Sequence, residues 1–427
     1  MIIVWRRLAG TVLGVPSFRR LWAGHSIATV GDQVFPVAVT VGVLDTHGGA
    51  TAVGLVLGAR WLGLVVFASV GGVWADRVSR IRLIRASTLV SALIVASLAV
   101  LPHLPSLPVL AAAVFAAGAA EAFLRPAETA LLPGILPGQR LAAGNALLTI
   151  SYRAASVIGP GLGALAVAAA GGPRLAFAVD AVALVVALGC FLRVREPARA
   201  TVPVAERAGL VAEVAEGVRA VRARPWIAAT LLVAMVQVLL LMGPEQVLLP
   251  VIGRRTFGTD GVYAASLMAM SLGALAGGLV AMRWRPRQPG LVSWLGCLPL
   301  ALMPLALLYP VGTWTLPAAY FVAGLCFEPF MVYWPTALQR EVPRALLARV
   351  SSLDWMTSLA LLPLGMALTG PVVRAVGTTP VLWVGVAACV IPIPFVLRVP
   401  GMRTFSGPGP AGAASEAVPA GTLTPSG

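Results

Sequence analysis

The chain contains no lysine: all 31 of its basic residues are arginine, and they stand against only 16 acidic residues. Charged residues make up 11% of the 427 positions, whereas about a quarter of the residues in ordinary soluble domains are charged. The absence of lysine excludes a Walker A phosphate-binding loop and a lysine Schiff base. The shortage of charge excludes an ordinary soluble enzyme.

Residues that bind metals or form disulfides are also few. The four cysteines are far apart in apolar stretches, at Cys190, Cys297, Cys326 and Cys389. The three histidines are scattered, and no HExxH pattern occurs. We therefore expect no disulfide framework, no metal site, no resident cofactor and no enzyme activity. The arginines are dispersed between apolar runs, which argues against nucleic-acid binding.

Apolar sequence is what the chain has in excess. Hydrophobic residues make up 59% of it, and the mean hydropathy is +0.91. A helix needs roughly 20 apolar residues to cross a bilayer. Twelve segments meet this requirement: 20–44, 52–75, 83–101, 108–132, 143–170, 174–193, 226–250, 262–282, 290–309, 314–338, 344–373 and 379–398. They lack the alternation of membrane β-strands, so we expect an all-α membrane protein with twelve transmembrane helices in the lipid bilayer.

The arginines predict the orientation of these spans. If the N-terminus is cytoplasmic, the connections on that side contain 24 arginines and those on the other side contain four. The positive-inside rule therefore places both termini in the cytoplasm. The longest cytoplasmic connection, residues 195–225, repeats apolar residues at helical spacing in its second half. This pattern predicts an amphipathic helix on the inner membrane surface.

The long connection divides the chain into two sets of six spans. The expected parts are a cytoplasmic N-terminal segment (1–17), a six-helix bundle (18–194), the linker (195–225), a second six-helix bundle (226–400) and a cytoplasmic tail (401–427). The tail is rich in Gly, Pro, Ala and Thr, so we expect it to be disordered.

The two halves share a weak internal repeat. A shift of about 206 residues superimposes Gly72 on Gly278, Arg77 on Arg283, Gly118 on Gly324 and Pro137 on Pro343. Such repeats are typical of secondary transporters, in which two bundles related by pseudo-two-fold symmetry enclose a site near the membrane midplane.

The connection between the second and third spans reads GVWADRVSRIR, residues 72–82. Gly72 allows two helices to approach closely, and Asp76 can pair with an arginine or accept hydrogen bonds from a helix N-terminus. With Arg77 and Arg80, these residues predict a cytoplasmic latch that forms in one conformation and breaks in another. The alternative is that the arginines only set the topology.

The fifth span contains ASVIGPGLGA, residues 155–164. Gly159, Pro160 and Gly163 allow a bend and a close helix contact. The motif lies inside a membrane span with no strand before it, so it is not a dinucleotide-binding loop. A generic packed kink is the alternative to a functional role.

Both motifs resemble signatures of the major facilitator superfamily. The first is similar to the family's loop pattern Gly-x-x-x-Asp-Arg-x-Gly-Arg-Arg, with Ser79 and Ile81 as departures, and the second resembles the Gly-Pro motif of its exporters. Three stretches are similar to the macrolide-efflux and enterobactin-exporter branch: FRRLWAGHSIATVGDQVF (18–35), FLRPAETALLP (123–133) and GPEQVLLPVIG (243–253). The resemblance covers residues 18–400 and implies an exporter of amphipathic small molecules.

Ionisable residues within the spans are costly and usually face a cavity or a partner. Asp32 and Arg153 lie at similar depth in the first and fifth spans, which the family fold places side by side, so an ion pair between them is expected. Glu121, Arg125 and Glu128 follow i, i+4, i+7 spacing on one face of the fourth span. That face is either a permanent salt-bridged stripe or a source of a proton-binding acid.

Asp32, Glu121 and Glu328 are the main candidates for proton coupling. Glu328 lies 207 positions after Glu121, near the symmetric place in the second half. Asp354 is a further candidate. Three other charged residues have open roles: Arg60 either draws an anion or pairs with an acid, and Asp180 and Glu245 are expected near the outer surface as gate or capping residues.

The sequence thus predicts a proton-coupled efflux transporter, driven by the proton gradient and acting as a monomer. Its substrate would be an amphipathic drug, natural product or siderophore. The abundance of Ala, Gly, Pro and Arg points to a GC-rich bacterium and hence to the bacterial inner membrane. A proton-coupled uptake symporter and a lipid or lysophospholipid flippase are the alternatives.

Overall fold

A computed structural model describes residues 12–101, 103–136, 138–196 and 210–406; within these ranges the side chains of residues 69–77, 139, 210–214, 344, 345 and 348 lie outside the description. The first half contains α2 (Pro16–Thr46), α3 (Gly49–Arg77), α4 (Arg80–Val100), α5 (Leu107–Ile135), α6 (Gln139–Ala170) and α7 (Arg174–Leu192). The linker contains α8 (Leu210–Arg222). The second half contains α9 (Pro225–Gln237), η1 (Val238–Met242), α10 (Gly243–Phe257), α11 (Gly261–Arg283), α12 (Pro289–Cys297), η2 (Leu298–Ala301), α13 (Leu302–Leu308), α14 (Thr315–Glu341), α15 (Arg344–Ala360), α16 (Leu362–Val376), α17 (Thr378–Val390) and α18 (Pro392–Val396).

The apolar runs form helices as expected, and the prediction of an all-α protein with twelve membrane spans is confirmed. Four spans of the second half are composite helices. Three of their breaks lie beside Pro299, Pro363 and Pro392, each of which stands in the first two positions of the element that follows the break. Proline lacks the N–H that would continue the preceding helix, which explains these interruptions.

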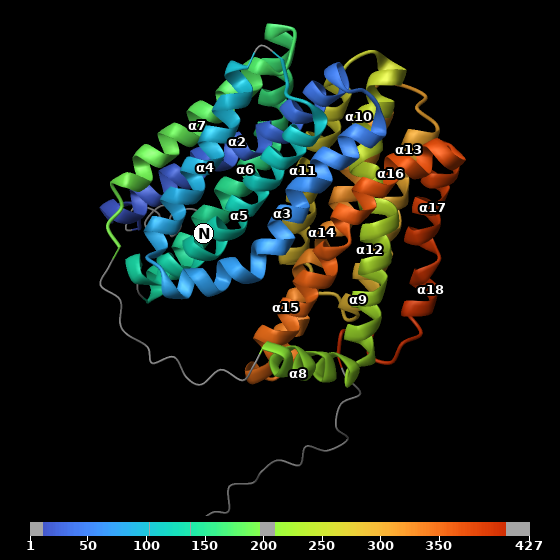
Figure 1. The fold of residues 1–427 in the computed structure, drawn as a ribbon. Helices are drawn as coiled ribbons and strands as arrows, with labels where there is room; N and C mark the ends of the chain where they lie inside the picture. Colours follow the sequence, from blue (N-terminus) through green and yellow to red (C-terminus); the bar gives the residue numbers. More distant parts are fainter. Residues whose placement is uncertain (1–11, 102, 137, 197–209, 407–427) are drawn as a thin grey trace, which may run out of the picture.

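The helices form two bundles, α2–α7 and α9–α18, which lie side by side in Figure 1. In each bundle one helix pair, α3 with α5 or α11 with α14, crosses at interlocking glycines. Four glycines lie against the backbone of the partner helix: Gly63 on Phe115, Gly118 on Arg60, Gly273 on Phe321 and Gly324 on Met270. The same crossing in both halves confirms the pseudo-two-fold symmetry.

The equivalent glycines also refine the alignment of the halves. Gly118 and Gly324 are 206 positions apart, as predicted, whereas Gly63 and Gly273 are 210 positions apart. At the crossing, α3 and α11 are therefore four residues, about one helical turn, out of register with the predicted shift. The shift of 206 applies again at the ends of these helices, Arg77 and Arg283, because α3 continues for 14 residues after Gly63 and α11 for 10 after Gly273.

The bundles are packed together at one end and diverge toward the other. Along α3 and α16, Gly54 lies on the backbone of Met366 and Gly370 on that of Thr51. These contacts lie near the end of the molecule where α2 turns into α3. Figure 1 shows the bundles moving apart toward the opposite end, where α8 lies.

The linker helix and the start of the tail both belong to the second bundle. On α8, Glu216 pairs with Arg349 of α15 at 2.5 Å. The expectation of disorder from residue 401 is wrong for residues 401–406, because Met402 and Phe405 are buried in the end of this bundle. Trp294 donates its indole N–H to Met402 Sδ at 3.0 Å. Residues 407–427 lie outside the described residues.

Candidate functional site

A cavity of about 620 Å³ lies between the two bundles. One wall comes from α2, α3, α5 and α6 and carries charged residues: His25, Asp32, Arg60, Glu121, Arg125 and Glu128. The opposite wall comes from η1, α10, α11 and α14 and is mostly apolar and aromatic: Met242, Leu249, Tyr263, Leu267, Met270 and Tyr320. Glu245 and Gln246 add polar groups to it. The cavity therefore has two chemically different faces, one on each bundle.

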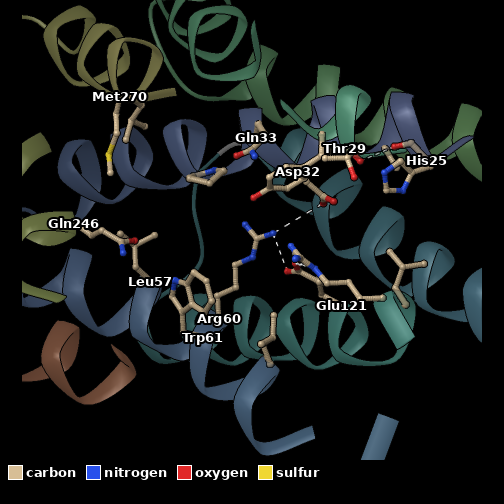
Figure 2. A pocket seen from close by; sticks show the side chains of 18 of the residues that line it. His25, Thr29, Asp32, Gln33, Leu57, Arg60, Trp61, Glu121, Gln246 and Met270 are labelled. Atoms are coloured by element: carbon tan, nitrogen blue, oxygen red, sulfur yellow. Dashed lines mark hydrogen bonds and ion pairs between the residues drawn. The ribbon is translucent and has the colours of Figure 1, made fainter. Parts of the chain in front are cut away.

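Arg60 is the centre of the charged wall, as Figure 2 shows. Its Nη2 atom lies 3.1 Å from Glu121 Oε2 and 4.0 Å from Asp32 Oδ1. Arg125 donates to the other oxygen of Glu121 at 2.6 Å and 3.0 Å. Glu121 is thus held by two guanidinium groups, while Asp32 has one at the limit of ion-pair distance. The Asp32 side chain is 38% exposed and that of Glu121 is 12% exposed.

The α3–α5 crossing explains why Arg60 reaches Glu121. Gly118 has no side chain, so the backbone at Arg60 lies directly against α5, one turn before Glu121. On the other side, the Arg60 guanidinium carbon lies 5.1 Å from the centre of the Phe35 ring of α2, a cation–π distance. Arg60 is thereby fixed between α2 and α5. The sequence left its role open, and the structure shows that Arg60 pairs with both acids.

The predicted stripe along α5 is divided between two partners. Arg125 binds Glu121, as an i, i+4 pair does. Glu128 instead turns toward α2, where its Oε2 lies 3.1 Å from His25 Nδ1. His25 could not be recognised from the sequence as a site residue, because a lone histidine in an apolar span gives no sign of which helix it faces.

Glu245 on α10 is the carboxylate of the opposite wall. Its residue surface is 6% exposed, and it accepts a hydrogen bond from the Tyr320 hydroxyl of α14. The gate or capping role expected for Glu245 stays a prediction, and the structure adds that this residue lines the cavity. The π-helical turn at Val238–Met242 immediately precedes α10, and such turns change which face a helix presents. The sequence carries no clear sign of this turn.

The expected ion pair between Asp32 and Arg153 is wrong. Arg153 pairs with Glu328 of α14, so it joins the two bundles rather than neutralising its neighbour in the first one. Neither Arg153 nor Glu328 lines the cavity. Helix depth is similar for Asp32 and Arg153, but their side chains leave α2 and α6 on different sides, and depth alone does not fix that direction.

Two further acids lie away from the cavity. Asp354 on α15 accepts a hydrogen bond from the Trp334 indole N–H, at 3.2 Å to each carboxylate oxygen. Asp180 on α7 is buried against Gly31 of α2 and lies six residues after Arg174, the first residue of α7. Among the described residues, no three His, Cys, Asp or Glu side chains gather so that they could hold a metal ion.

The predicted latch is described only in part. Gly72, Asp76 and Arg77 belong to the end of α3, where the side chains lie outside the description. Arg80 donates to the Ala130 carbonyl of α5 at 2.6 Å, a contact within the first bundle. Glu196 accepts the Arg80 backbone N–H at 3.1 Å and so caps the start of α4.

The Gly-Pro motif of α6 faces two neighbours. Gly159 lies against Gln33 and Gly163 against Val34, both on α2. Pro160 lies inside α6 between these contacts. Gly161 points the other way, toward Met268 of α11 in the second bundle. The motif therefore packs α6 onto α2 and also reaches the contact between the bundles.

Comparison with known proteins agrees with this architecture. The family model described as Major Facilitator Superfamily matches residues 21–361. The multidrug efflux pump Tap of Mycolicibacterium fortuitum is 29% identical over 396 residues, which cover 86% of this chain and 93% of that protein.

Solved structures show the same fold at low sequence identity. The D-xylose–proton symporter superposes with a TM-score of 0.67 at 10% identity, covering 93% of this chain and 99% of that one. A bacterial homologue of the human lysosomal transporter Spinster, in an inward-facing and unoccupied conformation, gives a TM-score of 0.67 at 16% identity, with 91% and 95% coverage. The nucleoside transporter NupG gives 0.65 at 13% identity, with 89% and 98% coverage. At these identities the likeness concerns the fold alone.

Proposed function

Because this chain belongs to the major facilitator superfamily of membrane transporters, we propose that it exports amphipathic small molecules across the bacterial inner membrane, driven by inward proton flow. The observation that carries the proposal is the two-faced cavity between the bundles. A charged wall on one bundle and an apolar wall on the other suit a molecule with a polar and an apolar part. The volume of the cavity, about 620 Å³, falls within the range of about 300–1,000 Å³ typical of drug-sized ligand sites.

The relation to a multidrug efflux pump supports export as the direction. That relative is a multidrug efflux pump, and the alignment runs along most of both chains. The Gly-Pro motif on α6, which resembles that of exporters, contacts both α2 and the second bundle. We therefore assign export, with both termini in the cytoplasm and the protein acting as a monomer.

The arrangement of the bundles fits alternating access. With the topology that the arginines predict, the packed end at Thr51 and Gly370 faces outward and the diverging end faces the cytoplasm. The cavity wall extends along the first bundle to Leu132 and Asn145, near that cytoplasmic end. Substrate would enter there, and rocking of the bundles would open the opposite end. Asp45 and Arg254, which pair across the bundles at 2.6 Å, would then separate.

Within this cycle we assign the coupling proton to Asp32. Its carboxylate is more exposed to the cavity than that of Glu121 and lies farther from Arg60. Glu121 is bound by both Arg60 and Arg125, so it is the acid that stays ionised. Protonation of Asp32 releases its hold on Arg60 and changes the charge of the wall that faces the substrate.

Accumulation of amphipathic compounds in cells tests the proposal. Cells that produce the wild-type chain should accumulate less of at least one compound, and a protonophore should abolish the difference. Asp32→Asn should abolish the protonophore-sensitive part, whereas Glu216→Gln, which removes an acid far from the cavity, should retain it. Higher accumulation in producing cells would indicate uptake instead. Lipid movement in vesicles without a proton gradient would indicate a flippase.

A further inference from the structure

We propose that Glu245 and Tyr320 form a subsite that binds the cationic group, such as a protonated amine, of the transported molecule. The inference rests on the proposed function, because it concerns the substrate that enters the same cavity. It assigns a chemical class to one end of that substrate and a position in the second bundle where this end binds.

The first step concerns the carboxylate itself. Glu245 is 94% buried by residue surface, since only 6% is exposed, and it lines the cavity. Among the described residues, its one hydrogen bond comes from the neutral Tyr320 hydroxyl, and no arginine or histidine pairs with it. A buried carboxylate is stable only with a proton or a cation beside it. The protein supplies neither a guanidinium nor an imidazole at this place.

The second step is that the other cavity acids are already paired. Glu121 binds Arg60 and Arg125, Asp32 lies beside Arg60, and Glu128 binds His25. With Glu245, the cavity is lined by four carboxylates but by only two guanidinium groups and one imidazole. Glu245 is the lining acid without a basic partner in the described part of the chain, so it is where an additional positive charge is favoured.

The third step concerns the surroundings of Glu245. Leu249, Leu267 and Met270 line the same wall and provide an apolar surface for the body of a substrate. The rings of Tyr263 and Tyr320 belong to this wall as well, and aromatic rings attract cations. Figure 2 shows Gln246, which follows Glu245 in the sequence, on the opposite side of the cavity from His25. A cationic head at Glu245 therefore leaves the apolar body on the second bundle.

The backbone around Glu245 holds it in place. Gly243 lies two residues before Glu245. A Cβ added to Gly243 would lie 2.8 Å from the backbone of Gly365 on α16, and a Cβ added to Gly365 would lie 2.8 Å from the Leu239 carbonyl oxygen, so neither glycine leaves room for a side chain. α10 is therefore pressed against α16, the helix that contacts α3 of the first bundle. A cation bound at Glu245 sits on a helix connected directly to the contact between the bundles.

The test compares a cationic and an uncharged probe on the purified full-length protein in detergent. The probes are rhodamine 6G, followed by fluorescence anisotropy, and radiolabelled chloramphenicol, followed by equilibrium dialysis. Loss of one charge-assisted bond weakens binding by about ten- to hundredfold. Glu245→Gln should lower the ratio of rhodamine to chloramphenicol affinity by that factor, and Glu245→Asp, which keeps the charge, should restore most of it. Glu216→Gln serves as the control and should leave the ratio unchanged.

The outcomes separate this inference from the proposed function. Wild-type protein that binds and exports chloramphenicol but not rhodamine 6G would overturn the cation subsite and leave export standing. An unchanged affinity ratio in Glu245→Gln protein that keeps the wild-type melting temperature would overturn it too. Wild-type protein that neither binds nor exports either probe, with no protonophore-sensitive efflux of any other amphipathic compound, would contradict the proposed function itself.

Discussion

Arg153 and Glu328 join the two bundles near the middle of their helices, and their unequal burial predicts an unequal response to mutation. The Glu328 side chain is 8% exposed and that of Arg153 is 39% exposed. Arg153→Met leaves a buried carboxylate without its partner, which costs about 3–5 kcal/mol. Glu328→Gln leaves the Arg153 guanidinium beside an amide oxygen that still accepts its hydrogen bond, so the cost is smaller, about 1 kcal/mol.

Unfolding of the purified protein in detergent measures this difference. Tryptophan fluorescence can follow the transition, because the chain has 11 tryptophans. Arg153→Met should lower the free energy of unfolding by about 2–4 kcal/mol more than Glu328→Gln does. The double variant should return to within about 1 kcal/mol of Glu328→Gln, since it no longer buries an unpaired charge. A Glu328→Gln protein at least as unstable as Arg153→Met would refute the reasoning.

Two other contacts give further predictions. Gly118→Val places a side chain against the Arg60 backbone and should cost about 1–3 kcal/mol of stability in the same assay. The control, Gly189→Val, should cost much less, because nothing lies within 4 Å of its added Cβ. Equal losses would contradict the close crossing of α3 and α5. Asp45→Asn removes the 2.6 Å ion pair between the bundles, while Arg254 keeps its ion pair with Asp260. The variant should therefore keep the wild-type melting temperature. A cysteine placed in the packed end should react faster with a thiol reagent. Unchanged labelling would show that this pair does not hold that end closed.

The fold could be predicted from the sequence because its main signals are local. Each span is a long apolar run, and the arginines between the runs mark one side of the membrane. The equivalence of Gly118 and Gly324 was also visible, since both glycines allow a backbone contact at the same helix crossing. The one-turn difference at Gly63 and Gly273 could not be predicted, because it depends on where along α3 and α11 the crossing lies.

The site could be predicted only in part, because pairing depends on which way each side chain leaves its helix. Asp32, Glu121 and Arg125 line the cavity, but the partner of Asp32 is Arg60 and not Arg153. The close crossing of α3 on α5 decides this, and it is a contact between distant segments. The place of Glu245 in the cavity wall could not be predicted, because the preceding π-helical turn has no recognisable pattern in an apolar run.

The burial of residues 401–406 could not be predicted from the sequence either. The tail has the composition of a disordered segment, yet Phe405 packs against Trp226 and Trp334 at ring distances of 5.8 Å and 5.7 Å. A space at the end of the second bundle, formed by residues far away in the sequence, determines the outcome. Composition alone does not reveal such a space.

The most direct test of the account is transport by the purified protein in vesicles with an imposed proton gradient. Rhodamine 6G should move against its own gradient when protons flow the opposite way, and transport should stop when a protonophore removes the gradient. Asp32→Asn protein, reconstituted to the same density, should bind the dye and fail to move it uphill. Uphill transport by Asp32→Asn protein equal to that of the wild type would contradict the assignment of the proton site, and wild-type transport that is indifferent to the gradient would contradict proton-driven export.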